Sequence, residues 1–125
     1  MTRLFLLLPC LLLLGCPADP TIEDVYTDVF IPSCAFSSCH GDQGAGGLSL
    51  ASPEDAEAEL IDVASEEVDG EIRVIPGDVE NSMLWKVLQG PVGLVGRMPP
   101  SDDDSASVTE AQMETVRAWI ESGAL

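Results

Sequence analysis

The sequence predicts a small all-α domain, a bundle of about four short helices joined by long loops. Apolar residues recur at helical spacing in several separate segments, which is typical of helices that bury one face. The connections between these segments are rich in glycine, proline, aspartate and serine, which favour loops. Aromatic residues make up only 5% of the chain, so the core is small and a disulfide, a metal or a cofactor is expected to stabilise it.

The first helix is predicted to run from Ile22 to Pro32. Its apolar residues are Ile22, Val25, Val29 and Phe30, and they share one helical face. Pro32 has no backbone N–H and is expected to close the helix just before Cys34.

The second helix is predicted to begin at Pro53. Ser52 is a candidate N-cap, and a proline is well tolerated at the first helical position because the N–H it lacks would have no partner there. The apolar stripe of this helix comprises Ala56, Leu60 and Ile61. The segment EIRVIPGD, residues 71–78, is predicted to be a short extended stretch stopped by its proline and glycine.

Two more helices are predicted in the second half of the chain. The segment ENSMLWKVLQG, residues 80–90, places Leu84, Val87 and Leu88 on one face and ends at Gly90. The loop that follows contains repeated prolines and glycines, which exclude a helix. Thr109 and Gln112 form a capping-box pair at the start of the last helix, which ends at Gly123. The apolar stripe of this helix is Met113, Val116, Trp119 and Ile120, and Trp119 is interpreted as core packing against the first helix.

The N-terminus has the features of an export signal. Arg3 precedes an apolar run from Leu4 to Leu14, which is shorter than the about 20 residues that a membrane-spanning helix needs. The run ends in LLGC, which resembles the lipobox of bacterial lipoproteins, in which cleavage precedes the cysteine and the cysteine is lipidated. Residues 1–15 are therefore predicted to be a lipoprotein signal peptide, residues 16–21 a tether lipidated at Cys16, and residues 22–125 the folded domain. The alternative is an ordinary signal peptide cut elsewhere, which leaves Cys16 as a free thiol.

The charge of the chain excludes some partners. Its formal net charge is -17 at pH 7, and every acidic residue lies after the signal segment. Nucleic acid is not expected to bind, because phosphate contacts need a basic face, and membrane association must come from the lipid. An acidic surface suits a basic protein partner, or serves solubility alone. The run Asp102 to Asp104 is interpreted as a solvated loop.

The segment CAFSSCHG holds the residues on which a functional prediction depends. Once Cys10 is removed with the signal and Cys16 is lipidated, Cys34 and Cys39 are the cysteines that remain. In an oxidising compartment they form a disulfide with each other or share a cofactor. His40, the single histidine of the chain, follows Cys39 directly.

The order of these segments resembles that of a class I cytochrome c domain, in the divergent form found in bacterial lipoproteins. A helix leads into CAFSSCHG and GGLSL, and RVIPGDVENSMLWKVL, RMPP and the final VRAWIESGAL follow. The resemblance implies a cytochrome c-like bundle around one haem c, bound covalently through Cys34 and Cys39. His40 is then one axial ligand of the iron. The usual motif has two residues between its cysteines, whereas this chain has four, from Ala35 to Ser38.

The second axial ligand implied by the resemblance is Met98 in RMPP. With no second histidine available, a thioether is needed, and the two prolines after Met98 stiffen the loop that carries it. Met83 and Met113 are interpreted as packing residues. Arg97 is a candidate to neutralise a haem propionate, or is simply a solvated loop arginine.

The expected function is electron transfer by a membrane-anchored mono-haem cytochrome, held on the periplasmic side of the inner or outer membrane or at the cell surface. Its partners would be redox proteins with a basic docking face. No catalytic constellation is seen, so an enzyme is not expected. The alternatives are a haem-free lipoprotein with a Cys34 to Cys39 disulfide and a binding or structural role, and a zinc site, for which the ligand set is incomplete.

Overall fold

The structure is a computed structural model that describes residues 15–100 and 107–125 of the chain. Its regular elements are all helical, and the described residues contain isolated β-bridges but no strand. The predicted all-α class is confirmed at this level. The predicted signal peptide, apart from Gly15, and the acidic run Asp102 to Asp104 lie outside the described residues.

Three consecutive elements form one unbroken first helix: α1 (Ile22–Val25), η1 (Tyr26–Phe30) and α2 (Ile31–Ser33). Thr21 caps its start, since its hydroxyl accepts the N–H of Asp24 while the carboxylate of Asp24 accepts the N–H of Thr21. The backbone N–H of Thr21, and then its hydroxyl, lower the pKa of Asp24 because both hydrogen bonds favour the carboxylate.

The first helix ends at Ser33, just before Cys34, so its predicted end is confirmed to within one residue. Pro32 itself lies inside α2. The turns before it widen to π-type hydrogen bonds, in which the N–H of Ile31 donates to the carbonyl of Tyr26. In a regular α-helix the carbonyl of Asp28 would accept from residue 32, which has no N–H here. The side-chain amide of Gln112 donates to that carbonyl instead, at 2.7 Å.

After the short 3₁₀ element η2 (Ala45–Gly47), three further α-helices follow: α3 (Pro53–Leu60), α4 (Met83–Gln89) and α5 (Glu110–Glu121). The predicted caps of α3 and α5 are confirmed: Ser52 accepts the N–H of Asp55, and Thr109 and Gln112 form a capping box. Gly90 follows α4 as predicted, but α4 begins at Met83 and not near residue 80. Residues 78–82 form a hydrogen-bonded turn in which the hydroxyl of Ser82, fully buried, donates to the carbonyl of Asp78.

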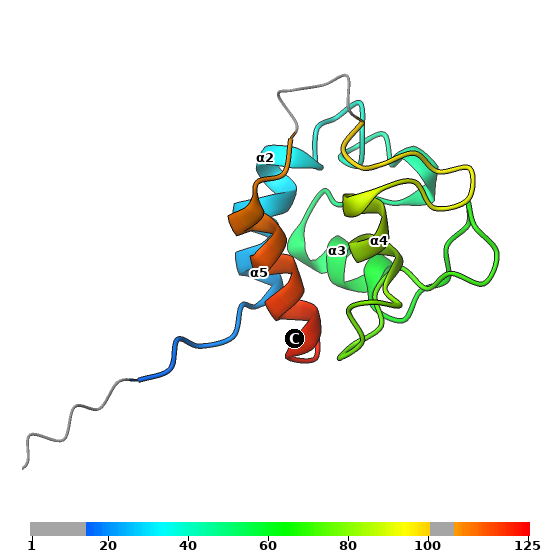
Figure 1. Cartoon of the computed structure of the whole chain (residues 1–125). Coiled ribbons are helices and arrows are strands. Elements are labelled where there is room, and N and C mark those ends of the chain that lie inside the picture. Colours follow the sequence, from blue (N-terminus) through cyan, green and yellow to red (C-terminus); the bar gives the residue numbers. More distant parts are fainter. Residues whose placement is uncertain (1–14, 101–106) are drawn as a thin grey trace, which may run out of the picture.

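The core lies between the first helix, α3 and α5 (Figure 1). α5 packs against both α1 and η1, and Trp119 is completely buried in that contact region, which confirms its interpretation as a core residue. The indole N–H of Trp119 donates to the carbonyl of Leu125, so its polar edge is satisfied. Most residues predicted from helical spacing are buried: Ile22, Val25, Val29, Phe30, Ala56, Leu60, Val87, Leu88, Val116, Trp119 and Ile120. The predicted Ile61, Leu84 and Met113 are only partly buried, and α4 also buries Met83 and Trp85, which its predicted stripe did not include.

The segment between α3 and α4 crosses the domain without forming a sheet. Isolated bridges join Ile61 to Val74, Ala64 to Ile72, and Ile72 to Ser82. The predicted extended stretch at 71–78 is therefore present only as single bridged residues. Its importance is that it carries the buried Arg73 and Val74 toward the centre of the domain.

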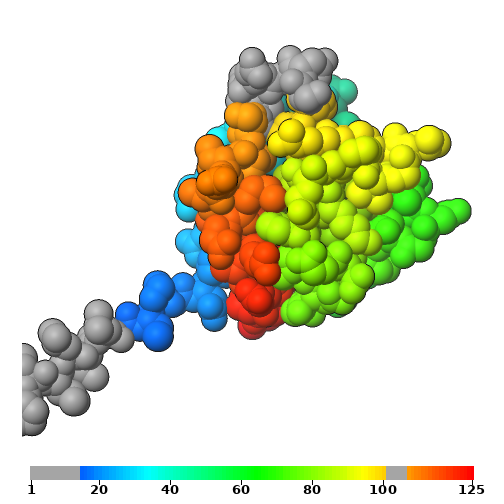
Figure 2. Space-filling view, viewed as in Figure 1, coloured from blue at the N-terminus to red at the C-terminus, as the bar shows by residue number. Residues whose placement is uncertain are grey.

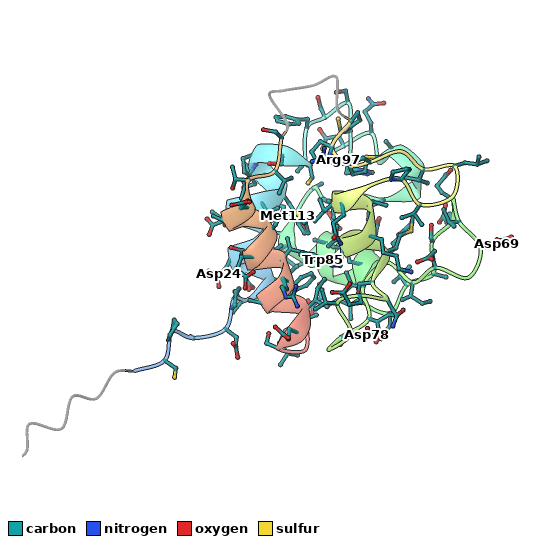
Figure 3. The ribbon with its side chains drawn as sticks, in the orientation of Figure 1. Asp24, Asp69, Asp78, Trp85, Arg97 and Met113 are labelled. Carbon is teal, nitrogen blue, oxygen red and sulfur yellow. The ribbon has the colours of Figure 1, made fainter. Side chains whose placement is uncertain are left out.

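The tether extends away from the body, as Figure 2 shows. Cys16 is exposed at its start, and the chain becomes partly buried at Pro20. Figure 3 shows Asp24, Asp69 and Asp78 projecting from different sides of the domain, and Trp85 lying near α5. The guanidinium carbon of Arg117 in α5 lies over the ring of Trp85, 5.7 Å from the ring centroid. Within the described residues, no helix has the length and apolar character needed to cross a membrane.

Candidate functional site

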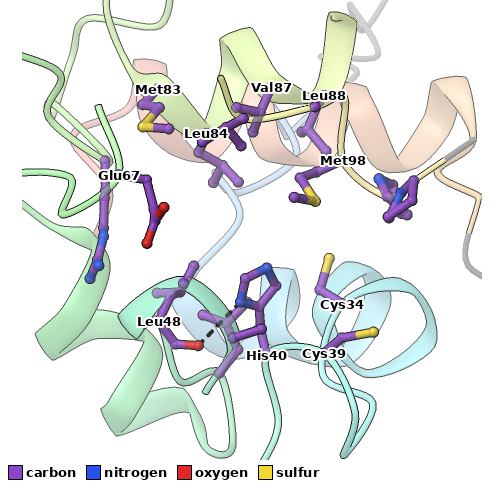
Figure 4. Close-up of a pocket in the computed structure, with 18 of the residues that line it drawn as sticks. Cys34, Cys39, His40, Leu48, Glu67, Met83, Leu84, Val87, Leu88 and Met98 are labelled. Carbon is purple, nitrogen blue, oxygen red and sulfur yellow. Dashed lines mark hydrogen bonds between the residues drawn. The ribbon is translucent and has the colours of Figure 1, made fainter. Parts of the chain in front are cut away.

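A cavity of about 650 Å³ opens beside the end of the first helix. This volume is in the range of small-molecule and cofactor sites, about 300–1,000 Å³. One wall is the segment from Cys34 to Leu50, and the opposite wall is α4 with the loop that reaches Pro100 (Figure 4). The lining is mainly apolar, with side chains that include Leu48, Leu50, Leu60, Met83, Leu84, Val87, Leu88, Leu94 and Val95.

The four residues between the cysteines fold into a compact turn. The N–H of Cys39 donates to the carbonyl of Phe36 at 2.9 Å, and the N–H of His40 donates to the carbonyl of Cys34 at 3.1 Å. Ala35, Phe36 and Ser37 do not line the cavity, whereas Cys34, Cys39 and His40 do. The longer spacer therefore still brings both cysteines and the histidine to one wall.

Gly41 makes this turn possible. A Cβ atom at this position would lie 2.7 Å from the carbonyl oxygen of Ala35 and 2.9 Å from that of Phe36. Both are backbone atoms that cannot move aside without opening the turn. The N–H of Gly41 also donates to the carbonyl of Phe36, so the chain after the histidine is held against the spacer.

His40 is partly buried and is oriented by one hydrogen bond. Its Nδ1 lies 3.2 Å from the carbonyl oxygen of Leu48, as the dashed line in Figure 4 shows. A carbonyl can only accept, so Nδ1 of the neutral ring carries the hydrogen and Nε2 keeps its lone pair. Figure 4 shows the outer edge of the ring facing across the cavity toward the wall that carries Met98. A histidine that binds a metal typically has this arrangement, with its second nitrogen bonded to a carbonyl or carboxylate.

Met98 lies on the opposite wall and is partly buried. Its backbone N–H donates to the carbonyl of Val87 at 2.8 Å, which ties the loop to the end of α4. Met83 also lines the cavity and is 92% buried, but Figure 4 shows it displaced from His40. Met113 packs against the core outside the cavity, as its interpretation as a packing residue predicts.

The two cysteines are unbonded thiols in this structure. Figure 4 shows the sulfur of Cys34 directed toward the cavity, while that of Cys39 points in another direction. Burial, and secondarily the neighbouring Cys39, raise the pKa of the Cys34 thiol to about 12. Cys34 is therefore held as the neutral thiol in the folded chain.

The residues present fit a c-type haem. The donor set is an imidazole nitrogen and a thioether on facing walls, two thiols near the imidazole, and apolar side chains between them. No group of three or more histidine, cysteine, aspartate or glutamate side chains among the described residues is arranged to hold a metal ion. A haem iron with one imidazole and one thioether ligand does not depend on such a group.

No protein-family model matches this chain, and the searches of curated proteins and of solved structures also found no match. The resemblance to class I cytochromes c therefore stays a prediction. Function is inferred from the residues of the cavity.

Sequence reasoning missed Arg73 as a cavity residue. Arg97, the arginine it singled out, is exposed and does not line the cavity, and its Nε donates to the carbonyl of Leu88 at 3.4 Å. Arg73 lies in the bridged segment, is only 7% exposed and does line the cavity. The signal available in the sequence was an arginine between apolar neighbours in EIRVIPGD, which is unusual for a solvated side chain.

Proposed function

We propose that this chain is a lipid-anchored mono-haem c-type cytochrome that acts in electron transfer. Cys34 and Cys39 would hold the haem through thioether bonds, with His40 and Met98 as axial ligands. The observation that carries the proposal is the orientation of His40. Its Nδ1–H is committed to the carbonyl of Leu48, and its other ring nitrogen is directed into an apolar cavity opposite a methionine.

The chain's own residues have separable roles in this proposal. The hydrogen bond from His40 to Leu48 fixes the tautomer and orientation of the imidazole. The backbone bond from Met98 to Val87 fixes the loop that presents the thioether. Leu84, Val87 and Leu88 of α4 would give the haem an apolar wall between the two ligands. When bound, the haem supplies the one-electron chemistry, and two protein ligands leave no open position for oxygen.

The exposed Cys16 and the extended tether support the lipid anchor. The proposed location is the periplasmic side of the inner or outer membrane, or the cell surface, reached by export of the chain. The acidic surface favours a redox partner with a basic docking face, and the small number of basic residues, five Lys and Arg against 22 Asp and Glu, argues against nucleic acid. No enzymatic activity is proposed, since the single histidine is assigned to ligation.

The test is expression with and without a haem-attachment system, followed by visible spectroscopy and mass measurement under denaturing conditions. We expect a Soret band that survives denaturation and a polypeptide whose mass includes the haem. The matched control is a Cys34→Ala/Cys39→Ala double variant, which should lose the haem on denaturation. A colourless product, lighter by one pair of hydrogens, would contradict the proposal and support the haem-free lipoprotein with a Cys34 to Cys39 disulfide.

A further inference from the structure

Three side chains with donor atoms for a soft metal ion lie around one part of the cavity. Figure 4 shows the sulfur atoms of Cys34 and Met98, and the outer edge of the His40 ring, directed toward the same region. The sulfur of Cys39 points in another direction and does not join them. The set is therefore one thiol, one thioether and one imidazole nitrogen. It contains only two histidine or cysteine side chains, because its third member is a methionine.

The backbone of the folded chain holds each of these three residues in place. The N–H of Cys34 donates to the carbonyl of Phe30 at 2.8 Å, which fixes Cys34 at the end of the first helix. The N–H of His40 donates to the carbonyl of Cys34 at 3.1 Å, so these two residues are tied to each other directly. The N–H of Met98 donates to the carbonyl of Val87 at 2.8 Å. Donors on a fixed backbone lose little conformational entropy when they bind a ligand.

The imidazole of His40 presents the correct nitrogen to this region. Its Nδ1 lies 3.2 Å from the carbonyl oxygen of Leu48, which can only accept a hydrogen bond. The lone pair is therefore on Nε2, at the edge of the ring that faces the two sulfur atoms. A carbonyl partner on the second nitrogen also makes a histidine a better and more rigid metal ligand.

The donor types and the charge of the site select the metal. Thiolate and thioether sulfur favour copper(I), whereas thioether sulfur is not among the usual ligands of zinc. One thiolate neutralises a monovalent ion, whereas a divalent ion would leave a net positive charge in a cavity whose lining is mainly apolar. The charged residues that border the cavity, Arg73 and Glu67, have opposite signs, so the wall adds no net charge.

We propose that Cys34, His40 and Met98 bind one copper(I) ion in the haem-free chain. The bond between copper and the sulfur of Cys34 forms as the S–H bond breaks, and the proton leaves to solvent without any change of oxidation state. This inference goes beyond the proposed function, because it concerns the chain before haem is attached. Haem would occupy the same space, so a chain that carries haem would have no copper site.

The experiment uses the reduced, haem-free mature chain in the absence of oxygen. Cys16→Ser removes the thiol that lipidation would otherwise block. The probe is copper(I) held by bicinchoninate, a coloured chelator whose absorbance falls as the protein takes the metal. We expect one copper(I) per chain, and an X-ray absorption spectrum with two sulfur neighbours and one nitrogen neighbour. No transfer of copper, or copper with sulfur neighbours only, would overturn the inference. Excess Zn²⁺ should leave the copper bound, and displacement would contradict selection of a monovalent ion.

Variants assign the ligands. Cys34→Ser and Met98→Leu should each weaken copper(I) binding at least about tenfold, since loss of even an outer-shell partner typically costs this much. Met83→Leu is the matched control for Met98→Leu, because Met83 lines the cavity but lies away from His40. It should leave the affinity unchanged, and an equal loss would overturn the assignment of Met98.

Cys39→Ser distinguishes the proposed set from a simple pair of thiols. This variant should still bind copper(I), whereas a loss as large as that of Cys34→Ser would show that the two cysteines bind the metal together and would overturn the inference. If a variant does not fold, the absorption spectrum of the chain that retains all three ligands decides alone. Failure to bind copper in a chain that attaches haem contradicts only this inference, and absence of covalent haem contradicts only the proposed function.

Discussion

The thiol of Cys34 should react much more slowly in the folded, haem-free protein than in the unfolded chain. An ordinary cysteine has a pKa of about 8.5, whereas burial and the neighbouring Cys39 raise that of Cys34 to about 12. At pH 8 the thiolate fraction then falls from about one quarter to about one ten-thousandth, a factor of roughly 2,000. The thiolate is the nucleophile, and its intrinsic reactivity rises with its pKa with a Brønsted slope of about 0.4–0.5, which offsets part of this factor. Alkylation should therefore slow by roughly 40- to 100-fold.

The assay uses the mature chain with Cys16→Ser, produced without haem attachment and treated with iodoacetamide. Modification of Cys34 and Cys39 is followed separately by peptide mass spectrometry, in buffer and in concentrated urea. Urea should restore rapid alkylation of Cys34, and Cys39 in the same sample reports on access to the turn. A Cys34 rate in buffer within about tenfold of its rate in urea would refute the reasoning.

The same pKa shift predicts a pH dependence of stability. The pKa of Cys34 in the folded chain lies above its unfolded value, so the unfolded chain loses its proton first as the pH rises. The contribution of this thiol is thus fully present below about pH 8.5 and is lost progressively toward about pH 12. Urea midpoints of the haem-free chain should fall over that window, and Cys34→Ala should flatten the fall.

Three further variants test the site and the helix that leads to it. Met98→Leu should abolish the weak red band of sulfur-ligated ferric haem. The control Met83→Leu should keep this band and should cost less than about 1.5 kcal/mol in unfolding free energy. A band that persists in Met98→Leu rules out Met98 as the ligand. Gly41→Ala should destabilise the chain by about 1–3 kcal/mol through its clash with two backbone carbonyls. Gly96→Ala, whose Cβ would meet no atom within 4 Å, should cost less than about 0.5 kcal/mol, and equal losses would contradict the close approach. Gln112→Glu keeps the side-chain oxygen that caps α5 but removes the N–H that donates to the carbonyl of Asp28. Urea unfolding should show a loss of about 1 kcal/mol in unfolding free energy, and this loss should be smaller in a Pro32→Ala background. Equal losses in both backgrounds would show that Gln112 does not replace the missing N–H.

Local signals in the sequence account for most of the helices. The caps at Ser52 and Thr109 and the apolar stripe of α5 are short-range patterns, and all three are confirmed. Pro32 is accommodated inside the helix, one residue before its end, because the widened turns before it and the amide of Gln112 compensate for its missing N–H. That amide comes from a helix far along the chain, and no local pattern indicates it.

The candidate site was predicted only in part for the same reason. The motif identifies Cys34, Cys39 and His40 as neighbours, and the structure places all three, with Met98, around one cavity. Arg73 reaches this cavity through bridges to distant segments, and Leu48 holds His40 through a backbone carbonyl. Backbone partners carry no side-chain signal, so the sequence does not reveal them.

The first helix separates the proposed lipid anchor from the cavity along the chain. Cys16 and the tether lie before its N-terminal end, and Cys34 follows its C-terminal end. Twelve residues from Ile22 to Ser33 rise about 18 Å, and the extended tether reaches at most about 20 Å. With the lipid in a bilayer, the cavity would be confined to a thin layer beside the membrane, at the end of the first helix that lies far from its own anchor. Partners held in the same membrane would then meet it at a high local concentration, whereas a partner in free solution would have to enter that layer.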